Sequence, residues 1–518
     1  MDTMKTPRRT LTSVLIASLL LAACAGSLDG NVAQAAEPWP PVWQDAALPL
    51  DDAPPAFTPP SATSCHRLPA MREVPGGAGQ SGNRHLGRAE RLERDAMKSD
   101  SRAEAKAAPE RRDAPAMAAG SVADALRERA PAAVAPAARP SGDASTSFAP
   151  EPWPAPPAPQ PTMPRPARET VTAGMVDDNA DFGEYLAYRQ RNAGLPVRER
   201  DISERYLLEV TDAQGDPVHD AEVAVQRAGV AQPLMWARTD TAGRVWLHPR
   251  AFLPRDGQGG QGDRVLGIAV RKNGVLGRAQ LQRGQASAVQ VRLGQPVAAQ
   301  RPRLDLVFMV DATGSMGDEI AKLKHSMHAM AQQIAQLPLQ PDVCWGLVAY
   351  RDRGDAFLTR TQDFTDDLRG FQQVLGQLQA DGGGDTPEAL NEALHEVVHG
   401  LSWRRDAARM VVLVADAPPH LDYGGPQYDT DMQAALAKGI KLFAVGASGL
   451  DPVGEYIYRQ IAQYTAGRFV FLTYRDGADP ASGPGTQTTH DVKQYSVQTL
   501  DRLVVKLVGD ELAKLKRT

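Results

Sequence analysis

The strongest pattern in the chain begins after residue 303, where short apolar runs alternate with longer amphipathic stretches. LDLVFMV (304–310) is a continuous apolar run, and similar runs follow at 343–350, 410–415, 440–446 and 468–472. Helical spacing of apolar residues lies between most of these runs, at 317–337, 365–379, 387–401, 429–439 and 453–465. Apolar runs without alternation are typical of strands that are buried on both faces. The pattern therefore predicts a doubly wound α/β domain with a mostly parallel sheet.

A different pattern covers residues 203–296. Segments such as RYLLEVTD, AEVAVQR and RVLGIAVRK alternate or run apolar, and turn clusters such as DAQGDP and DTAGR separate them. Short strands with this spacing predict a small antiparallel β-sandwich. The stretches VTDAQGDPV and ARTDTAGRV resemble Ig-like or transthyretin-like modules of bacterial surface proteins, which implies a spacer or a binding surface. No catalytic pattern occurs in this part of the chain.

Proline is concentrated ahead of these two domains. Residues 25–170 contain 24 of the 41 prolines of the 518-residue chain. Proline fixes φ and removes a hydrogen-bond donor, and few apolar residues are available there for a core. We therefore predict that residues 24–170 form a long disordered region that acts as a tether. Residues 171–200 follow as a short helical linker, in which Phe182, Tyr185 and Tyr188 share one helix face and are expected to dock on the next domain.

The first residues indicate export. A basic start with Arg8 and Arg9 precedes a short apolar stretch, Leu11 to Leu21, and then the small residues that come before a cleavage point. The tetrapeptide LAAC, which ends at Cys24, resembles the lipobox of bacterial lipoproteins. The resemblance implies a signal peptide over residues 1–23, lipidation of Cys24 and, because Ala25 follows the cysteine, an outer-membrane location. Acyl chains of this kind hold a protein stably at a membrane.

Charge and cysteine content exclude several classes of protein. The net charge is −5 with no concentrated basic stripe, which excludes the electrostatic footprint of a nucleic-acid binder. No apolar run approaches the ~20 residues of a membrane-spanning helix. The three cysteines are too few for a disulfide scaffold or a Cys₄ zinc site. With Cys65 in the predicted tether and Cys344 in an apolar strand, we expect no disulfide between these two.

Candidate metal-ligating residues lie where two of the predicted apolar strands end. The first strand runs directly into DATGSM, which supplies Asp311, Thr313 and Ser315, and a later strand runs directly into Asp416. Ligands bind outside the carboxyl ends of the strands in such sheets. Carboxylates and hydroxyls are hard oxygen ligands that suit Mg²⁺, Mn²⁺ or Ca²⁺.

These motifs resemble those of von Willebrand factor type A (VWA) domains, which have a Rossmann-like fold. DATGSM is similar to the D-x-[S/T]-x-S motif of the family, GGGDTPEAL (382–390) to its second metal loop and VVLVADAPPH to its third. The resemblance covers residues 303–515. It implies a metal-ion-dependent adhesion site (MIDAS) formed by Asp311, Thr313, Ser315, Thr386 and Asp416. Loop two leaves an alternative open, because its PEA context also resembles loops in which a glutamate reaches the metal; Glu388 is then the rival of Thr386, with Asp385 as a neighbour.

Incomplete coordination of the cation suggests how such a domain works. Mg²⁺ keeps water ligands when the protein provides few, and a partner's carboxylate can displace one of them. The resemblance therefore implies a lipid-anchored envelope protein that binds a protein partner and breaks no bond. Two other functions stay open: an envelope assembly or scaffolding factor that uses the domain without adhesion, and an unrecognised hydrolase.

The enzyme alternatives have weaker support. Thr313 stands where a phosphatase of the haloacid dehalogenase type needs a second aspartate, and neither a GxxxxGK[ST] loop nor a GxSxG elbow occurs. We interpret Asp352 and Asp355 as solvated carboxylates beside arginines. We assign no H-E-x-x-H zinc site to the chain and interpret His395 and His399, which are four residues apart, as surface residues without a third ligand.

Overall fold

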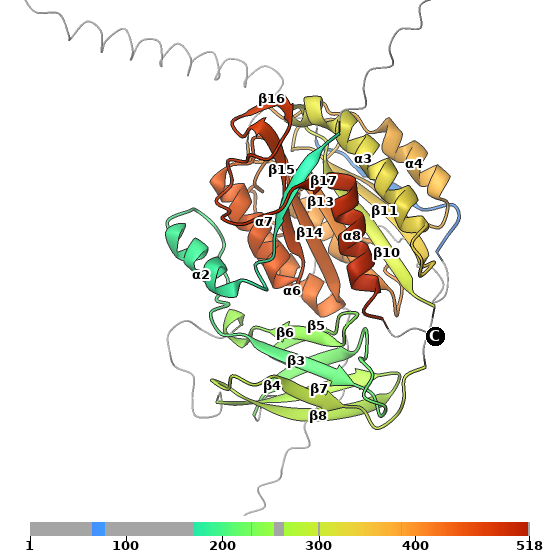
Figure 1. Ribbon diagram of the computed structural model, residues 1–518, viewed down its shortest axis with the longest axis vertical. Helices are drawn as coiled ribbons and strands as arrows, with labels where there is room; N and C mark the ends of the chain where they lie inside the picture. Colours follow the sequence, from blue (N-terminus) through green and yellow to red (C-terminus); the bar gives the residue numbers. More distant parts are fainter. Residues whose placement is uncertain are drawn as a thin grey trace, which may run out of the picture.

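The computed structural model describes residues 65–77, 170–228, 230, 232–252, 264–298, 301–384 and 386–515. These residues form an α/β domain and a smaller β domain beside it (Figure 1). The predicted signal peptide, Cys24 and most of the predicted tether lie outside the described residues. Among the helices of the described part, none combines the length and the apolar character needed to cross a membrane.

The centre of the α/β domain is a sheet built from the five predicted apolar runs. Its parallel strands are β10 (Arg303–Asp311), β11 (Asp342–Tyr350), β13 (Ala408–Ala415), β14 (Ile440–Gly446) and β15 (Arg468–Asp476). They are hydrogen-bonded in the order β11, β10, β13, β14, β15, so the first of them lies inside the sheet. The strand order therefore reverses between β10 and β13, and the prediction of a doubly wound sheet is confirmed.

Short antiparallel strands extend the sheet at both edges. Beyond β11 lie β12 (Thr359–Thr365) and β1 (Met71–Val74), and beyond β15 lie β2 (Thr172–Val176) and β17 (Gln498–Thr499). A further strand, β16 (Asp479–Pro484), forms a hairpin with β15. These strands contain polar residues among their apolar ones, so they lack the apolar runs that reveal the central strands.

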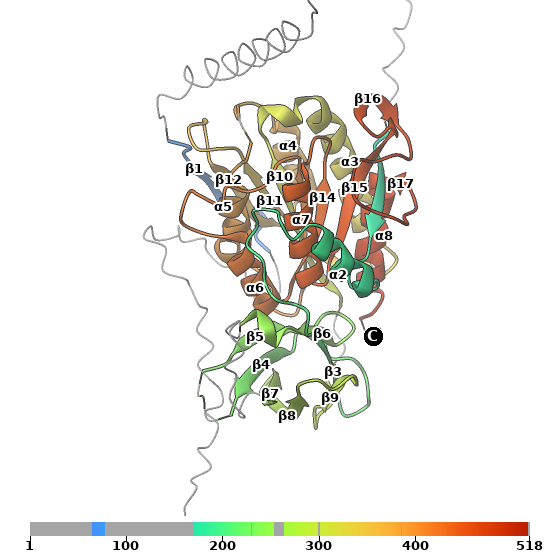
Figure 2. The ribbon, with the colours of Figure 1, turned by 90° about the vertical axis from the view of Figure 1, so that its left-hand side faces the viewer.

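Helices cover both faces of this sheet (Figure 1 and Figure 2). One face packs against α3 (Gly317–Ala335), α4 (Leu368–Gln377) and α8 (Leu500–Leu512), and the other against α5 (Leu390–His395), α6 (Tyr428–Lys438) and α7 (Pro452–Tyr464). Along β10, Leu306 and Phe308 belong to the first core, whereas Val307 and Met309 belong to the second. Burial on both faces explains why the strand is apolar without interruption.

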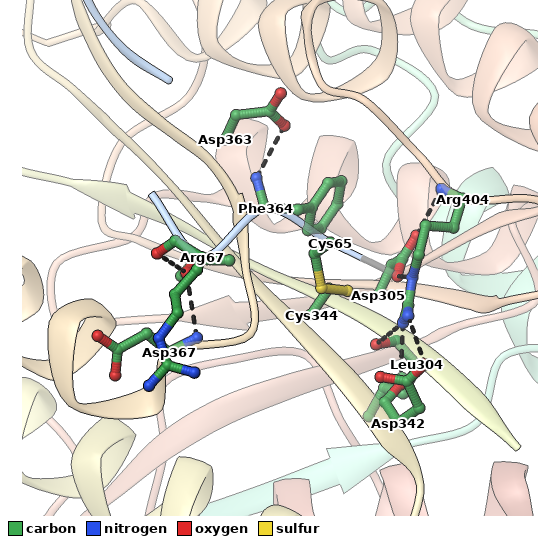
Figure 3. The surroundings of a disulfide bond; sticks show 11 residues. Cys65, Arg67, Leu304, Asp305, Asp342, Cys344, Asp363, Phe364, Asp367 and Arg404 are labelled. Atoms are coloured by element: carbon green, nitrogen blue, oxygen red, sulfur yellow. Dashed lines mark hydrogen bonds and ion pairs between the residues drawn. A yellow bond between two sulfur atoms is a disulfide. The ribbon is translucent and has the colours of Figure 1, made fainter. Parts of the chain in front are cut away.

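Part of the predicted tether belongs to the folded α/β domain. Cys65 forms a disulfide with Cys344 of β11, with their Cα atoms 6.0 Å apart (Figure 3). A few residues later, β1 pairs antiparallel with β12. The predictions of no disulfide between Cys65 and Cys344 and of disorder throughout residues 24–170 are therefore wrong. A single four-residue strand in a proline-rich region gives no sequence signal, because the sheet edge that stabilises it is nearly 300 residues away.

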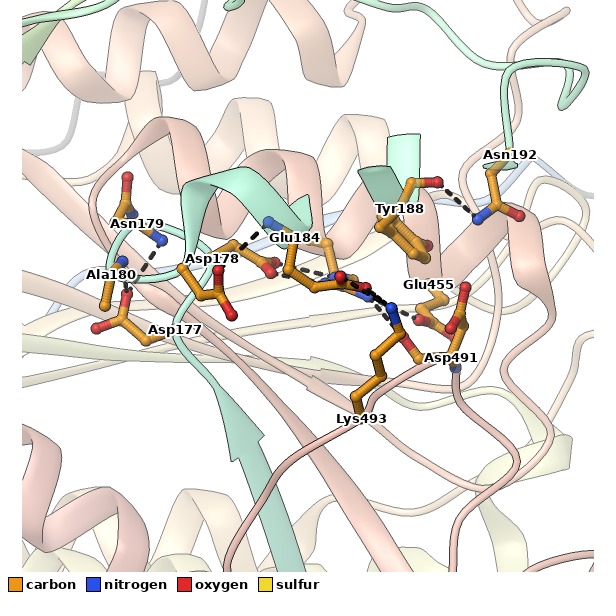
Figure 4. Close-up of polar contacts among 12 residues, drawn as sticks. Asp177, Asp178, Asn179, Ala180, Glu184, Tyr188, Asn192, Glu455, Asp491 and Lys493 are labelled. Atoms are coloured by element: carbon orange, nitrogen blue, oxygen red, sulfur yellow. Dashed lines mark hydrogen bonds and ion pairs between the residues drawn. The ribbon is translucent and has the colours of Figure 1, made fainter. Parts of the chain in front are cut away.

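The predicted linker, residues 171–200, also belongs to the α/β domain. Its first residues form strand β2, which lies between β15 and β17. Its helix, α2 (Phe182–Arg191), packs on α7, where the rings of Tyr188 and Tyr456 stack at a centroid distance of 5.9 Å. On the outer side, Lys493 Nζ donates a hydrogen bond of 2.9 Å to Glu184 (Figure 4). The helix therefore docks on the α/β domain, and the prediction that it docks on the next domain is wrong.

The smaller domain consists of two sheets. One contains β3 (Tyr206–Thr211), β6 (Arg244–Leu247) and β9 (Val289–Arg292), and the other contains β4 (Glu222–Arg227), β5 (Met235–Arg238), β7 (Val265–Lys272) and β8 (Val275–Gln282). Buried residues from both sheets, including Leu208 and Val270, belong to one core. Strands β3 and β9 pair in parallel, which differs from the purely antiparallel arrangement that we expected. The Ig-like or transthyretin-like resemblance stays a prediction.

Candidate metal-binding site

Two aspartates emerge side by side at the carboxyl edge of the central sheet. Asp311 is the last residue of β10, and Asp416 directly follows the end of β13. The two strands are parallel neighbours in which Val310 pairs with Val414, so both carboxylates leave the sheet at the point where the strand order reverses. The predicted meeting of loops one and three is thus present.

Loop one is held by its own hydroxyl and amide groups. Asp311 Oδ1 accepts hydrogen bonds from the backbone N of Thr313 (2.9 Å) and from its Oγ1 (2.7 Å). The hydroxyls of Thr313 and Ser315 lie 3.1 Å apart. The three predicted side chains of this loop therefore converge. The backbone N of Gly314 donates to the carbonyl of Gly382 (3.0 Å), which joins loop one to loop two.

Only glycine fits where the two loops touch. A Cβ atom at position 314 would lie 2.8 Å from the carbonyl oxygen of Gly382, closer than real Cβ contacts. On the other side of this contact, Gly382 and Gly383 have φ values of +78° and +68°, a conformation that is costly for residues with a Cβ. The GGG sequence thus lets the backbone of loop two lie directly on loop one.

Burial and mutual repulsion raise the pKa values of two carboxyl groups here. Burial, followed by the charge of Asp416, raises the pKa of Asp311 to about 7, although hydrogen bonds from Thr313 oppose the shift. Burial, followed by the charges of Asp311, Asp352, Asp355 and Asp416, raises the pKa of Glu388 to about 10. Asp311 Oδ2 and Glu388 Oε2 are both buried and accept no hydrogen bond from the described residues. We call the five acidic residues Asp311, Asp352, Asp355, Glu388 and Asp416 the carboxylate cluster.

Such a set of oxygens fits a hard divalent cation. Carboxylates that repel one another are stabilised when a cation takes a place among them, and buried oxygens without donors have lone pairs available for it. Zn²⁺ and copper usually take nitrogen or sulfur ligands, which this cluster lacks. Its chemistry therefore matches Mg²⁺, Mn²⁺ or Ca²⁺.

Comparison with known proteins agrees with this geometry. Residues 305–477 match the family model of the von Willebrand factor type A domain. This part of the chain is a VWA domain. Domains of this type serve in protein interaction and scaffolding.

The relatives are similar to the chain over short stretches only. It is 37% identical over 93 residues to von Willebrand factor A domain-containing protein 7 of Mus musculus, which is 18% of this chain and 10% of that protein. It is 29% identical over 119 residues to alpha-protein kinase vwkA of Dictyostelium discoideum, 23% of this chain and 19% of the kinase. An ariadne-like RING finger protein of Acanthamoeba polyphaga mimivirus is 32% identical over 117 residues, 23% of this chain and 11% of that protein. The chain thus spans less than a fifth of each relative, and these relatives are eukaryotic or viral.

The two candidates for the loop-two ligand of the VWA domain lie in different surroundings. Thr386 is exposed, whereas Glu388 is only 2% exposed and lies within the field of Asp311 and Asp416. Their possible neighbour Asp385 lies outside the described residues. Glu388 therefore belongs to the carboxylate cluster, and the choice between it and Thr386 as the metal ligand stays a prediction.

Asp352 and Asp355 belong to the edge of the same site. The side chain of Asp352 is 8% exposed, lies 3.4 Å from His420 Nε2 and accepts hydrogen bonds of 3.0 and 3.1 Å from the hydroxyl of Tyr423. Asp355 Oδ2 accepts from the backbone N of Gly383 (2.8 Å) and so fixes loop two. The interpretation of Asp352 as a solvated carboxylate is wrong. The sequence does contain a signal for this placement. RDRGD follows the end of β11, the strand next to β10, so its acidic residues reach the same edge of the sheet as Asp311.

The interpretation of His395 and His399 as surface residues is also wrong. Their side chains are 10% and 12% exposed, and both contact Asp431, which is 1% exposed. Asp431 lies on α6, more than thirty residues further along the chain. This group shares no residue with the carboxylate cluster.

Proposed function

We propose that this chain is a lipid-anchored cell-envelope protein whose VWA domain binds a protein partner through a divalent cation. The observation that carries the proposal is the pair of buried oxygens, Asp311 Oδ2 and Glu388 Oε2, in a cluster of mutually repelling carboxyl groups. The ligand set is Asp311, Thr313, Ser315, Asp416 and one residue of loop two. Mg²⁺ is the first choice, with Mn²⁺ and Ca²⁺ as alternatives.

The side chains of the proposed cation site have different roles. Asp311 and Asp416 bring negative charge from two adjacent strands, while Thr313 and Ser315 offer hydroxyl oxygens from one turn. Asp355 positions loop two through Gly383. A bound cation offers a coordination position that a partner's carboxylate can occupy, which is recognition without a chemical step.

The remaining parts of the chain suit presentation of this domain. Lipidation of Cys24 would hold the chain at the outer membrane, and the proline-rich segment would let the domain reach a partner. The β domain then serves as a spacer or a second binding surface. We propose binding rather than catalysis because the chemistry of the cluster is explained by the cation alone.

Metal titration of the full-length protein tests the proposal. Thermal melting of wild type should rise with Mg²⁺ or Mn²⁺ and fall back with EDTA, because a ligand that binds only the folded state stabilises it. Asp311→Ala should lose this response. Asp366→Ala is the matched control, since Asp366 is an exposed aspartate of the same domain. A wild-type melting temperature that is indifferent to all three additions would overturn the proposal.

A second experiment addresses the partner. Wild type and Asp311→Ala, immobilised in parallel, are incubated with envelope extract in Mg²⁺ and in EDTA. Proteins retained by wild type only in Mg²⁺, and lost with Asp311→Ala, support metal-dependent adhesion. Retention that is equal in EDTA and in the variant would support the scaffolding alternative, in which the domain assembles complexes without the metal.

A further inference from the structure

Residues 395–399 read His-Glu-Val-Val-His, which matches the H-E-x-x-H pattern. The pattern is therefore present in the chain, although we predicted none. Two histidines four residues apart place both imidazoles on one side of a helix, which is the arrangement that zinc sites of this pattern use. In the structure the two rings stack, with their centroids 4.4 Å apart.

A third side chain completes the group. His395 Nδ1 lies 3.2 and 3.3 Å from the two carboxylate oxygens of Asp431, and His399 Nε2 lies 3.1 Å from Oδ1. One ligand atom from each residue lies within 4.8 Å of the others. Two ligand atoms that are each about 2.0–2.1 Å from a tetrahedral Zn²⁺ lie about 3.3 Å apart. The observed nitrogen–oxygen distances therefore agree with two edges of such a tetrahedron.

The surroundings hold these three side chains in place. Asp431 lies in the first turn of α6, where the helix dipole favours a negative charge. The helix that carries the histidines changes at His395 from an α-helix to a π-helix, Glu396–Gly400. Single π-helical turns are rare and are frequent at functional sites.

We propose that His395, His399 and Asp431 form a second metal site, one that binds Zn²⁺ and is independent of the carboxylate cluster. Imidazole nitrogens suit zinc, whereas the all-oxygen cluster at the sheet edge suits magnesium. Three protein ligands leave one coordination position, and His399, as the least buried of the three, lies on the side that faces solvent. The chain thus carries two sites that differ in ligand chemistry.

The same geometry argues against a peptidase. In an H-E-x-x-H enzyme the glutamate is the general base that activates water. Here Glu396 Oε2 is paired with Arg72 Nη1 at 2.9 Å, and Arg72 lies on β1, the strand that follows Cys65. An oxygen engaged by a guanidinium is not available to take a proton from water. The ion would therefore link α5 to α6, with water in its fourth coordination position, rather than serve a peptidase.

Zinc binding to the full-length chain in the Asp311→Ala background tests the proposal, because this background removes the other metal site. Equilibrium dialysis with Zn²⁺ should give one ion per chain, and Co²⁺ should give the visible absorption of a four-coordinate ion. Adding His399→Gln or Asp431→Asn should weaken binding by about 100-fold or more, since a ligand matters at least as much as its supporting shell. Adding His325→Gln, which changes an exposed histidine, should have no effect.

The outcomes separate this site from the function proposed above. Zinc binding that survives Asp311→Ala and is lost with His399→Gln supports it, whatever Mg²⁺ does at the sheet edge. Absence of Zn²⁺ binding by both wild type and Asp311→Ala would overturn it, and so would equal affinity in the His325→Gln and Asp431→Asn chains. Circular dichroism of each variant verifies folding, and Glu396→Gln should retain zinc within about threefold, because that residue is no ligand here.

Discussion

Asp220 of the β domain forms a buried ion pair with Arg409 of the VWA domain, with Oδ1 and Nη1 2.8 Å apart. The backbone N of Asp406 donates to the other oxygen of the same carboxylate at 3.0 Å. Arg238 of the β domain adds a second guanidinium at 3.0 Å. One carboxylate therefore joins the two domains, and both partners of the pair are almost inaccessible to water.

This pair predicts how acid affects the protein. Burial alone would raise the pKa of Asp220, but the charges of Arg409, Arg238 and Lys272 outweigh it and hold that pKa well below its usual range. A carboxyl whose pKa is depressed by folding stabilises the protein above its unfolded value, about 3.9, and this contribution is lost as pH falls through the lower folded value. Wild type should therefore lose stability below about pH 4.

Asp220→Asn tests the same pair at neutral pH. Removing one member of a buried pair leaves the guanidinium of Arg409 without its charge partner, which should cost about 3–5 kcal/mol. Urea unfolding at pH 7 and at pH 3.5 should show a smaller pH dependence in the variant than in wild type. The exposed Asp479→Asn is the control and should behave like wild type. Equal pH dependence in all three chains would contradict the prediction.

The disulfide provides a second prediction. Cys65→Ser removes the covalent link to Cys344 and leaves β1 held by its pairing with β12 and by the Arg72–Glu396 ion pair. Loss of a disulfide typically costs about 2–4 kcal/mol. The free energy of unfolding should fall accordingly, and trace protease should cut within residues 66–77, which wild type protects. A reducing agent should reproduce both effects in wild type and change nothing further in the variant; full protection of this segment in the variant would count against the prediction.

Loop two of the metal site provides a third. Glu388→Ala should weaken Mg²⁺ binding by about 10-fold or more, because it removes a buried carboxylate oxygen from the cluster. Thr386→Ala should have a smaller effect, because a hydroxyl brings no charge to the cation. Calorimetric titration of the two variants decides between the residues, and the reverse ranking would restore Thr386 as the ligand.

The anchor gives a fourth prediction. Cys24→Ser should abolish lipid modification, because serine lacks the thiol that accepts the acyl group. Mass spectrometry of the mature amino terminus measures this directly, and the variant should leave the membrane fraction. A wild-type chain that begins elsewhere than Cys24, or that carries no lipid there, would contradict the assignment.

The sequence predicts the part of the fold that is buried most deeply. Strands such as β10 and β13 are apolar throughout because helices cover both of their sides, and their ends place Asp311 beside Asp416. By contrast, β12 reads TRTQDFT and β2 reads TAGMV, patterns that fit a sheet edge only when the neighbouring strand is known. Helix α8 also escaped prediction, although its burial on the sheet is complete at Leu500 and Val504.

The same limit applies to the candidate sites. Loop one is local in sequence, so the spacing of Asp311, Thr313 and Ser315 was sufficient to predict that they converge. The His–Asp group includes Asp431 from another helix, and no residue close to His395 in the sequence indicates that contact. The Cys65–Cys344 bond spans 279 residues, so its partners could be matched only in three dimensions.

That bond also determines how tension would travel through the molecule. Force applied to the chain before Cys65, as by an anchor at the amino terminus, passes through sulfur into β11 at Cys344 without loading the backbone between them. The bypassed segment includes the whole β domain. Strand β11 carries the force towards its carboxyl end at Tyr350, beside Asp311 and the face where a partner would pull. The β domain would thus carry no tension. A pull between an anchor and a partner would be carried by the VWA sheet.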